Sequence, residues 1–410
     1  MEKRSVSFSL PDISELEISE VTEALRSGWI TTGPRTKELE RRMAKFCGTK
    51  KMVCLGSATA AEELNLRILG VGPGDEVIVP AYTYTATASA AIHCGANVVF
   101  IDSQKDGDPV THSPEMDYDA VEAAINEHTK AIIPVDLGGI MCDYDRLHQV
   151  VEHKKHLFRP SNPVQEAIGR VAILSDCAHA VGASRHGIMA GGPGSSDMAS
   201  YSFHAVKNFT TAEGGAATWN IEGIDDDALY QQYQLYSLHG QNKDALAKTR
   251  LGAWEYDIIG PWYKCNMTDV TAAIGLRQLD RYPGLLERRR QIIQKYDALC
   301  EELGIFHLNH YSADHASSGH LYLTRIPGIN EEQRNEIIIK MMERGIATNV
   351  HYKPLPMMTA YKEYGWDIKD FPNAYDYYRN LVSLPLHTKL SDEDVEYVCE
   401  CFGEVVKEYI

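Results

Sequence analysis

The chain has 410 residues, with 57 Asp and Glu against 40 Lys and Arg, a formal charge of −17, and 44% hydrophobic residues. Such an acidic chain without a long Lys/Arg tract is a poor candidate for binding nucleic acids or anionic membranes. No stretch approaches the roughly 20 apolar residues of a membrane-spanning helix, and the first seven residues lack the apolar core of a signal peptide. We therefore expect a soluble globular protein, long enough for two domains.

The nine cysteines indicate a reducing compartment. They are odd in number, scattered and form no C-x-x-C pair, so neither a disulfide framework nor a zinc knuckle is expected. His307, His310, His315 and His320 lack a carboxylate or cysteine at metal-site spacing, and we expect loop histidines there. We infer a cytoplasmic location and no metal site.

The first two thirds of the chain alternate helical patterns with short apolar runs. Ile18, Val21 and Leu25 recur at helical spacing, and a second helix is expected at 37–46. Apolar runs predict strands at 52–55, 76–80, 98–102, 131–135, 171–175, 198–203 and 215–219. Helical patterns lie between them at 60–69, 84–94, 118–126 and 143–154. This alternation predicts an α/β fold with a mainly parallel sheet and helices on both faces.

After about residue 266 the pattern becomes that of a smaller α+β domain. Thr268 can cap a helix that runs to Tyr282 and that Pro283 ends. A charged helix follows at 285–303, and its basic run 288–290 is expected on a solvated face. Further predictions are a strand at 320–326, a helix at 331–344, a strand at 347–351 and a helix at 392–409. We expect a large domain over 1–265, linking helices and a small domain over 266–410, and an insertion at 157–169.

Residues 56–61, Gly-Ser-Ala-Thr-Ala-Ala, join an expected strand to an expected helix. Small residues allow a ligand to approach the backbone, the start of a helix offers free N–H groups, and Thr59 adds a hydroxyl. The segment can therefore hold a phosphate without a Walker lysine. Alone it is a weak indication, because Ser or Thr at the start of a helix is usually only a cap.

Two further segments follow expected strands. The strand at 171–175 is followed by Asp176, at the edge where parallel α/β sheets bind ligands. The strand at 198–203 precedes Lys207, among aromatic and small residues, where loss of hydration can make a lysine nucleophilic. Each alone could be a helix cap or a surface lysine. Together with the phosphate segment they match the three needs of pyridoxal phosphate (PLP): a phosphate anchor, an acid for the pyridine nitrogen, and a lysine for the aldehyde.

The sequence resembles the DegT/DnrJ/EryC1/StrS family of PLP-dependent sugar aminotransferases, which have PLP fold type I, the aspartate-aminotransferase-like fold. The resemblance spans almost the whole chain and is carried by segments 28–34, 72–78, 176–180, 202–208 and 266–269. Within the group, the Ser-Ala-Thr-Ala and Ser-Phe-His-Ala-Val-Lys-Asn motifs are most similar to those of the UDP-4-amino-4-deoxy-L-arabinose–oxoglutarate aminotransferases. The resemblance implies a seven-stranded, mainly parallel sheet with a small α+β C-terminal domain.

The resemblance also implies roles for individual residues. Lys207 matches the lysine that forms the Schiff base, Asp176 the partner of the pyridine nitrogen, and His179 a position near the cofactor's phenolic oxygen. The other positions that match cofactor contacts are Ala58, Thr59 and Ser202 for the phosphate, Tyr84 for stacking on the ring, and Asn266 for the phosphate of the partner subunit. The positions that match segments bordering the sugar are Thr32, Gly33, His351 and Tyr352. A homodimer with shared active sites follows from the Asn266 match.

The expected reaction transfers an amino group, from glutamate as in the family, to a ketosugar linked to a nucleotide diphosphate. Two other enzyme classes stay open: an aminotransferase for a cyclitol or aminobenzoate-type ketone, and a PLP-dependent sugar dehydratase, although that branch has His in place of the lysine. A non-catalytic PLP-binding regulator is disfavoured, because no DNA-binding domain is visible and the chain is acidic.

Overall fold

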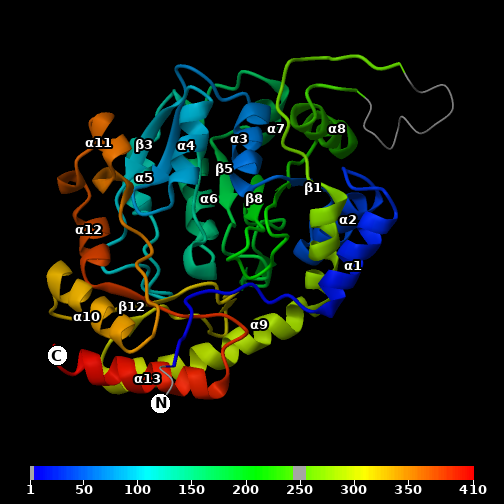
Figure 1. Ribbon diagram of the computed structural model, residues 1–410. Coiled ribbons are helices and arrows are strands. Elements are labelled where there is room, and N and C mark those ends of the chain that lie inside the picture. The colour runs from blue at the N-terminus through cyan, green and yellow to red at the C-terminus, as the bar shows by residue number, and fades with distance from the viewer. Residues whose placement is uncertain (1–3, 243–254) are drawn as a thin grey trace.

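A computed structural model describes residues 4–242 and 255–410 (Figure 1). Its centre is a seven-stranded sheet in the order β1-β9-β8-β5-β4-β2-β3. The strands are β1 (Met52–Leu55), β2 (Glu76–Pro80), β3 (Asn97–Ile101), β4 (Thr129–Ile132), β5 (Ala172–Asp176), β8 (Met198–Ser202) and β9 (Gly215–Trp219). All neighbours pair in parallel except β9, which is antiparallel to both β8 and β1. The predicted fold class, with its mainly parallel sheet, is confirmed.

Helices cover both faces of the sheet, as expected for strands that are apolar throughout. One face packs against α3 (Ala58–Leu69), α4 (Thr85–His93), α8 (Asp226–Ser237) and α12 (Pro372–Arg379). The other packs against α2 (Pro34–Cys47), α5 (Tyr118–Ala124), α6 (Tyr144–His153) and the first half of α9 (Asp269–Leu303). α1 (Glu15–Arg26) lies outside this layer against α9, at the edge of the molecule (Figure 1).

The C-terminal part has its own apolar core and a three-stranded antiparallel sheet, in the order β10-β12-β13. Its strands are β10 (Phe306–His307), β12 (Tyr322–Arg325) and β13 (Leu381–Leu384), and its main helices are α10 (Glu331–Glu343) and α13 (Asp392–Val406). The short helix α11 (Thr359–Glu363) precedes α12. A third small sheet joins β6 (Ser184–Arg185), β7 (Ile188–Met189) and β11 (His315–Ala316).

Pro283 does not end a helix, so that prediction was wrong. α9 runs through it as one helix of 35 residues. Proline removes one N–H from the helix ladder at a cost of about 3 kcal/mol, and packing on both sides of it offsets this cost. The first half of α9 packs on α1 and α2, and α9 also packs on α13. Beside the proline, the fully buried Tyr282 donates a hydrogen bond to the Val181 carbonyl at 2.7 Å.

Three other predictions were wrong in the C-terminal part. Residues 347–351 form no strand. In this described stretch Asn349 makes an isolated bridge to Ser383, and the neighbouring residues do not extend the bridge into a ladder. Arg289 is not on a solvated face: it is 4% exposed and donates to the carbonyls of Gly319 and Leu386 at 3.1 and 3.0 Å. His307 and His315 are not in loops, because His307 lies in β10 and the buried His315 lies in β11. In the first two cases tertiary contacts overrode a local pattern.

The insertion at 157–169 lies away from the carboxyl end of β5, as expected. It contains α7 (Pro163–Ile168), which enters β5 from the strand's amino end. The side-chain amides of Asn162 and Gln165 donate to the Leu69 carbonyl at the end of α3, at 2.7 and 2.8 Å. The insertion therefore caps the far end of the helix whose first turn was predicted to hold a phosphate.

Candidate active site

A cleft of about 390 Å³ opens at the carboxyl ends of β5 and β8, where α3 and α4 begin. It gathers segments that are far apart in the sequence. Nine of the predicted site residues line it: Ala58, Thr59, Tyr84, Asp176, His179, Ser202, Lys207, His351 and Tyr352. The predicted strand-end segments therefore meet in one place.

The first turn of α3 forms an anion cradle on one side of the cleft. Ser57 caps the helix by accepting a hydrogen bond from the Ala60 N–H at 3.1 Å. The N–H groups of Ala58 and Thr59 belong to the first helical turn, which has no partner within the helix, so they can bind an anion. Gly215 passes so close that a Cβ there would lie 2.4 Å from the Ala58 nitrogen. Only glycine permits this approach of β9 to the start of the helix.

Asp176 lies in the floor of the cleft and is 6% exposed. Its carboxylate accepts hydrogen bonds from the Ala178 N–H and the Thr87 hydroxyl, both at 3.0 Å. The Thr83 hydroxyl is 3.0 Å from that of Thr87 and donates to it, because Thr87 gives its own proton to Asp176. Hydrogen bonds of this kind favour the charged form of a carboxyl group.

Lys207 is positioned by the turn that follows β8. Its N–H donates to the His204 carbonyl at 2.9 Å, and it lines the same cleft as Asp176. Loss of hydration lowers the pKa of the Lys207 amine to about 8, although the Asp176 carboxylate acts in the opposite direction. A substantial neutral fraction near pH 8 makes this amine a nucleophile and a proton acceptor.

The imidazole of His179 is held neutral and in one tautomer. Burial lowers its pKa well below the usual value, and the Lys207 charge adds to this effect. The Gly138 N–H donates to Nδ1 at 3.2 Å, so the ring proton is on Nε2 and points to the Tyr352 hydroxyl, 3.2 Å away. The Tyr352 hydroxyl accepts this hydrogen bond, so it can donate its own hydrogen bond into the cleft.

Tyr84 and His351 complete the wall of the cleft. The Tyr84 side chain is 60% exposed, and its ring centroid lies 5.9 Å from that of Tyr352. Burial and the Lys207 charge lower the pKa of His351 to about 4, and its Nδ1 lies 3.0 Å from the Ser383 hydroxyl. Tyr82 ties this segment to the large sheet, because its hydroxyl donates to the His351 carbonyl at 3.0 Å and accepts from the Tyr352 N–H at 2.9 Å.

Three predicted residues lie outside the cleft of their own chain, among the residues that the structure describes: Thr32, Gly33 and Asn266. Instead, they lie near one another and are held by hydrogen bonds. Asn266 Nδ2 donates to the Thr32 hydroxyl at 2.5 Å, which donates to the Met267 carbonyl at 2.5 Å. The Gly33 N–H donates to Asp269 at 2.8 Å.

Sequence reasoning missed three groups that the structure places in or around the cleft. Glu62 and Thr87 approach Asp176 from α3 and α4. The His320 ring contacts that of His179 with centroids 4.3 Å apart and a tilt of 42°, and its Nδ1 lies 2.8 Å from Asn208 Oδ1. Glu62 could have been noticed as an acid at the core-facing spacing of α3, four residues before Leu66; the other two carry no signal in the sequence.

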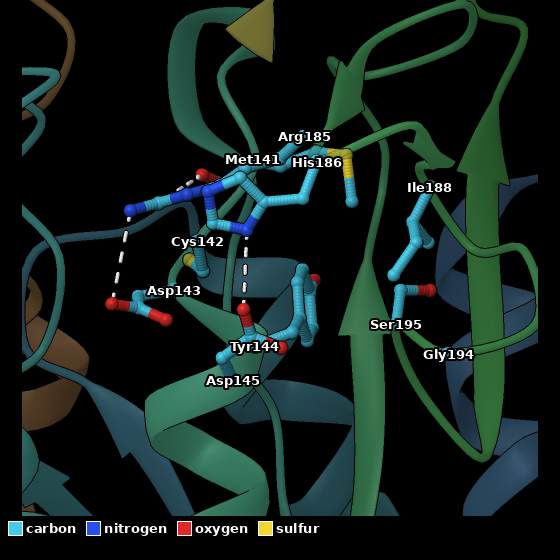
Figure 2. A pocket seen from close by; sticks show the side chains of 10 residues that line it. All are labelled: Met141, Cys142, Asp143, Tyr144, Asp145, Arg185, His186, Ile188, Gly194 and Ser195. Atoms are coloured by element: carbon cyan, nitrogen blue, oxygen red, sulfur yellow. Dashed lines mark hydrogen bonds and ion pairs between the residues drawn. The ribbon is translucent and has the colours of Figure 1, made fainter. Parts of the chain in front are cut away.

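A second hollow, shown in Figure 2, is too small to be an organic ligand site. It encloses about 10 Å³, room for one water molecule. Arg185 closes it by donating to the Met141 carbonyl at 3.1 Å and pairing with Asp143, while His186 lies 3.1 Å from Asp145 (Figure 2). Within residues 4–242 and 255–410, no cluster of three His, Cys, Asp or Glu side chains could hold a metal ion. Over the same residues, no helix is both long and apolar enough to cross a membrane.

Comparison with known proteins decides the family. The DegT/DnrJ/EryC1/StrS aminotransferase family matches residues 11–403. The chain belongs to this family. The spore coat polysaccharide biosynthesis protein SpsC of Bacillus subtilis (strain 168) is 36% identical over 407 residues, covering 98% of this chain and 97% of SpsC.

Solved structures agree with this family. The putative sugar aminotransferase Spr1654 of Streptococcus pneumoniae in its PMP form has a TM-score of 0.95 at 56% identity, covering 99% of this chain and all of that chain. Its PLP form has a TM-score of 0.94 at 54% identity and the same coverage. PseC of Helicobacter pylori, an aminotransferase involved in the biosynthesis of pseudoaminic acid, has a TM-score of 0.83 at 26% identity, covering 99% and 100%. The chain is therefore a PLP-dependent aminotransferase.

The cleft of this aminotransferase fits PLP. The N-terminus of α3 offers N–H donors and a positive dipole end for a phosphate dianion, and Thr59 and Ser202 add hydroxyls. Asp176 offers a carboxylate, and Lys207 a partly neutral amine. The close approach of Gly215 to the start of α3 keeps the cradle free of side-chain atoms.

Proposed function

We propose that this aminotransferase transfers an amino group from glutamate to a ketosugar that is linked to a nucleotide diphosphate, in the biosynthesis of an aminosugar. The observation that carries the proposal is the single cleft that unites an anion cradle, a hydrogen-bonded carboxylate and a lysine with a pKa of about 8. The sugar class is supported by the named activities of the relatives, one in spore coat polysaccharide biosynthesis and one in pseudoaminic acid biosynthesis.

The residues of the cleft have different roles in this reaction. Thr59, Ser202 and the first turn of α3 hold the phosphate, with about 1.5–3 kcal/mol for each charge-assisted hydrogen bond. Asp176 would face the pyridine nitrogen and keep it protonated. Bound PLP supplies an electron sink that stabilises negative charge on the carbon bearing the amino group. The Lys207 amine would hold the cofactor, and as a free amine it could accept and return a proton during the transfer.

His179 and the aromatic residues orient the cofactor. The neutral His179 holds the Tyr352 hydroxyl, and His179 itself would lie near the cofactor's phenolic oxygen. Tyr84 stacks on the ring from the open side of the cleft, where its side chain is 60% exposed. His351 and Tyr352 border the sugar from within the cleft. Thr32 and Gly33 lie outside the cleft of their own chain, so they would border the sugar in the partner subunit's cleft.

The assembly that this requires is a homodimer with shared sites. Asn266 is held beside Thr32 and lies outside its own cleft, which supports a contact with the phosphate in the other subunit. Leu16, Ile18 and Leu25 of α1 are each at least 50% exposed, an apolar surface that a second copy would cover. We further propose a cytoplasmic enzyme whose large domain covers 1–265 and whose linking helices and small domain cover 266–410.

The substrate is tested with a panel of nucleotide-linked 3- and 4-ketosugars and free cyclic ketones, offered to enzyme first converted to the pyridoxamine form with glutamate. We expect turnover of at least one nucleotide-linked ketosugar and conversion of glutamate to 2-oxoglutarate. Turnover of cyclitol or aminobenzoate-type ketones, with every nucleotide sugar refused, would instead establish the second candidate class.

The mechanism is tested in the same panel with Lys207→Ala. We expect loss of the visible absorption band of lysine-bound cofactor and a fall in the glutamate half-reaction of about 10³-fold or more, because both the covalent link and the proton-moving group are removed. Lys340→Ala, an exposed lysine on α10, is the matched control and should leave both unchanged. A glutamate half-reaction that survives in Lys207→Ala contradicts the role of Lys207.

A further inference from the structure

Glu62 is a buried acid in the cofactor cleft that none of the roles above uses. It lies in the second turn of α3, lines the cleft and is 4% exposed. Its Oε1 accepts a hydrogen bond from the Ser200 hydroxyl at 3.3 Å. Its Oε2 is fully buried, and no donor in the described part of the chain reaches it. A buried carboxyl oxygen without a partner is costly, so a partner or a function is expected.

The fold places Glu62 against Asp176. Ser200, which holds Glu62, is the register partner of Asp176 in the parallel pairing of β8 with β5. The Glu62 carboxyl lies within hydrogen-bonding reach of Asp176. Two carboxylates cannot both stay charged in contact in a buried site, so the pair shares one proton.

The surroundings decide which carboxyl carries that proton. Asp176 accepts from the Thr87 hydroxyl and the Ala178 N–H, whereas Glu62 accepts only from Ser200 within the described residues. Burial and the neighbouring Asp176 raise the pKa of Glu62 well above its usual value, and the Lys207 charge, which acts in the opposite direction, does not offset them. Glu62 is therefore the member of the pair that carries the proton.

We propose that Glu62 is a positioning residue that donates a hydrogen bond through Oε2 to the Asp176 carboxylate. This bond satisfies the otherwise unpartnered oxygen, fixes the orientation of Asp176 and lowers its affinity for a proton. A second proton lies between Asp176 and the pyridine nitrogen. A less basic Asp176 leaves this proton on the nitrogen, the state in which PLP is the stronger electron sink. The inference rests on the proposed pairing of Asp176 with that nitrogen.

The test measures the pyridine nitrogen directly, by ¹⁵N NMR of enzyme reconstituted with ¹⁵N-labelled PLP, and the Kd for PLP by dialysis. In Glu62→Leu we expect the ¹⁵N signal to move toward the neutral pyridine value and the Kd to rise about tenfold, the worth of one charge-assisted hydrogen bond. Glu62→Gln can accept from Ser200 and donate to Asp176, so it should keep the wild-type signal and a Kd within about twofold.

Matched variants make each outcome decisive. Glu63→Gln alters the neighbouring acid of α3, which instead pairs with Arg67 and His93, and should change nothing. Thr87→Val removes another donor to Asp176 and should shift the signal in the same direction as Glu62→Leu, which covers the case in which the leucine variant folds poorly. If Glu62→Gln behaved like Glu62→Leu, Glu62 would act through a negative charge, and the proposal would be wrong.

Wild-type signals and affinities in all Glu62 variants would also overturn the proposal. Asp176→Asn separates this failure from failure of the proposed function. If Asp176→Asn moves the ¹⁵N signal and Glu62→Leu does not, only the role of Glu62 is lost. If Asp176→Asn leaves the signal unchanged, the pairing of Asp176 with the pyridine nitrogen is itself contradicted.

Discussion

Single residues in the cleft owe their chemistry to burial more than to their identity. The same loss of hydration lowers the pKa of Lys207 and of His179 and raises that of Glu62. It therefore leaves the His179 imidazole and the Glu62 carboxyl group neutral, and it gives the Lys207 amine a substantial neutral fraction near pH 8. The Lys207 amine can therefore both take and give a proton near that pH, which is what the transfer of an amino group requires.

The titration of Lys207 gives a test at this scale. In the apoenzyme we expect its labelling by an amine-reactive reagent to rise with pH and level off above about 8, the pKa that burial gives this amine, because only the neutral amine reacts. Peptide mass spectrometry over a pH series measures it. Lys340, whose pKa is raised by its hydrogen bond to Glu408, serves as the slow reference in the same digest. Equal midpoints for both lysines would contradict the effect of burial.

At the scale of elements, the start of α2 depends on a single carboxylate from another helix. Asp269, the first residue of α9 and fully buried, accepts from the N–H groups of Gly33, Arg35 and Thr36 at 2.8–3.0 Å and from the Thr36 hydroxyl at 2.7 Å. Gly33, the N-cap residue of α2, has no side chain to do this. The carboxylate also faces the positive end of the α2 dipole.

We predict that Asp269→Ala lowers the free energy of unfolding by about 3 kcal/mol, because several buried N–H groups lose their acceptor. Thr36→Val removes only the hydroxyl bond and should cost about 1 kcal/mol. Urea unfolding at fixed protein concentration measures both. An Asp269→Ala midpoint no lower than that of Thr36→Val would show that water or another group replaces the carboxylate.

How much the sequence predicts also differs by element. The strands and the motifs at their ends could be predicted, because apolar runs and strand-end Asp and Lys are local signals. The continuity of α9 through Pro283 could not, since it depends on packing against α1, α2 and α13. Glu62 was missed although its spacing to Leu66 places it on the core-facing side of α3, because a glutamate in a helix usually faces solvent. Its position beside Asp176, however, depends on the tertiary fold. The site residues themselves keep the roles that the family resemblance implies, as proposals.

For the whole molecule, the charge of −17 opposes the anionic cofactor and the proposed substrate. The cleft counters it locally with Lys207 and the first turn of α3, and it keeps Glu62 neutral. Fixed dipoles and hydrogen bonds act at contact distance, whereas the net charge of the surface is screened beyond about 10 Å in 0.1 M salt. Solubility and anion binding are thus separate properties of the same chain.

The last prediction concerns the shared site of the proposed dimer. A hybrid dimer of Lys207→Ala and Asn266→Ala chains contains one intact site if Asn266 serves the partner's cofactor, because the intact lysine and the intact asparagine then come from different chains. One intact site out of two predicts about half of the wild-type activity for the purified hybrid, above the level of either variant alone. Co-expression with two affinity tags, followed by assay of the purified hybrid, measures it. If Asn266 acts within its own subunit, no hybrid has an intact site, and the activity stays at the average of the two variants.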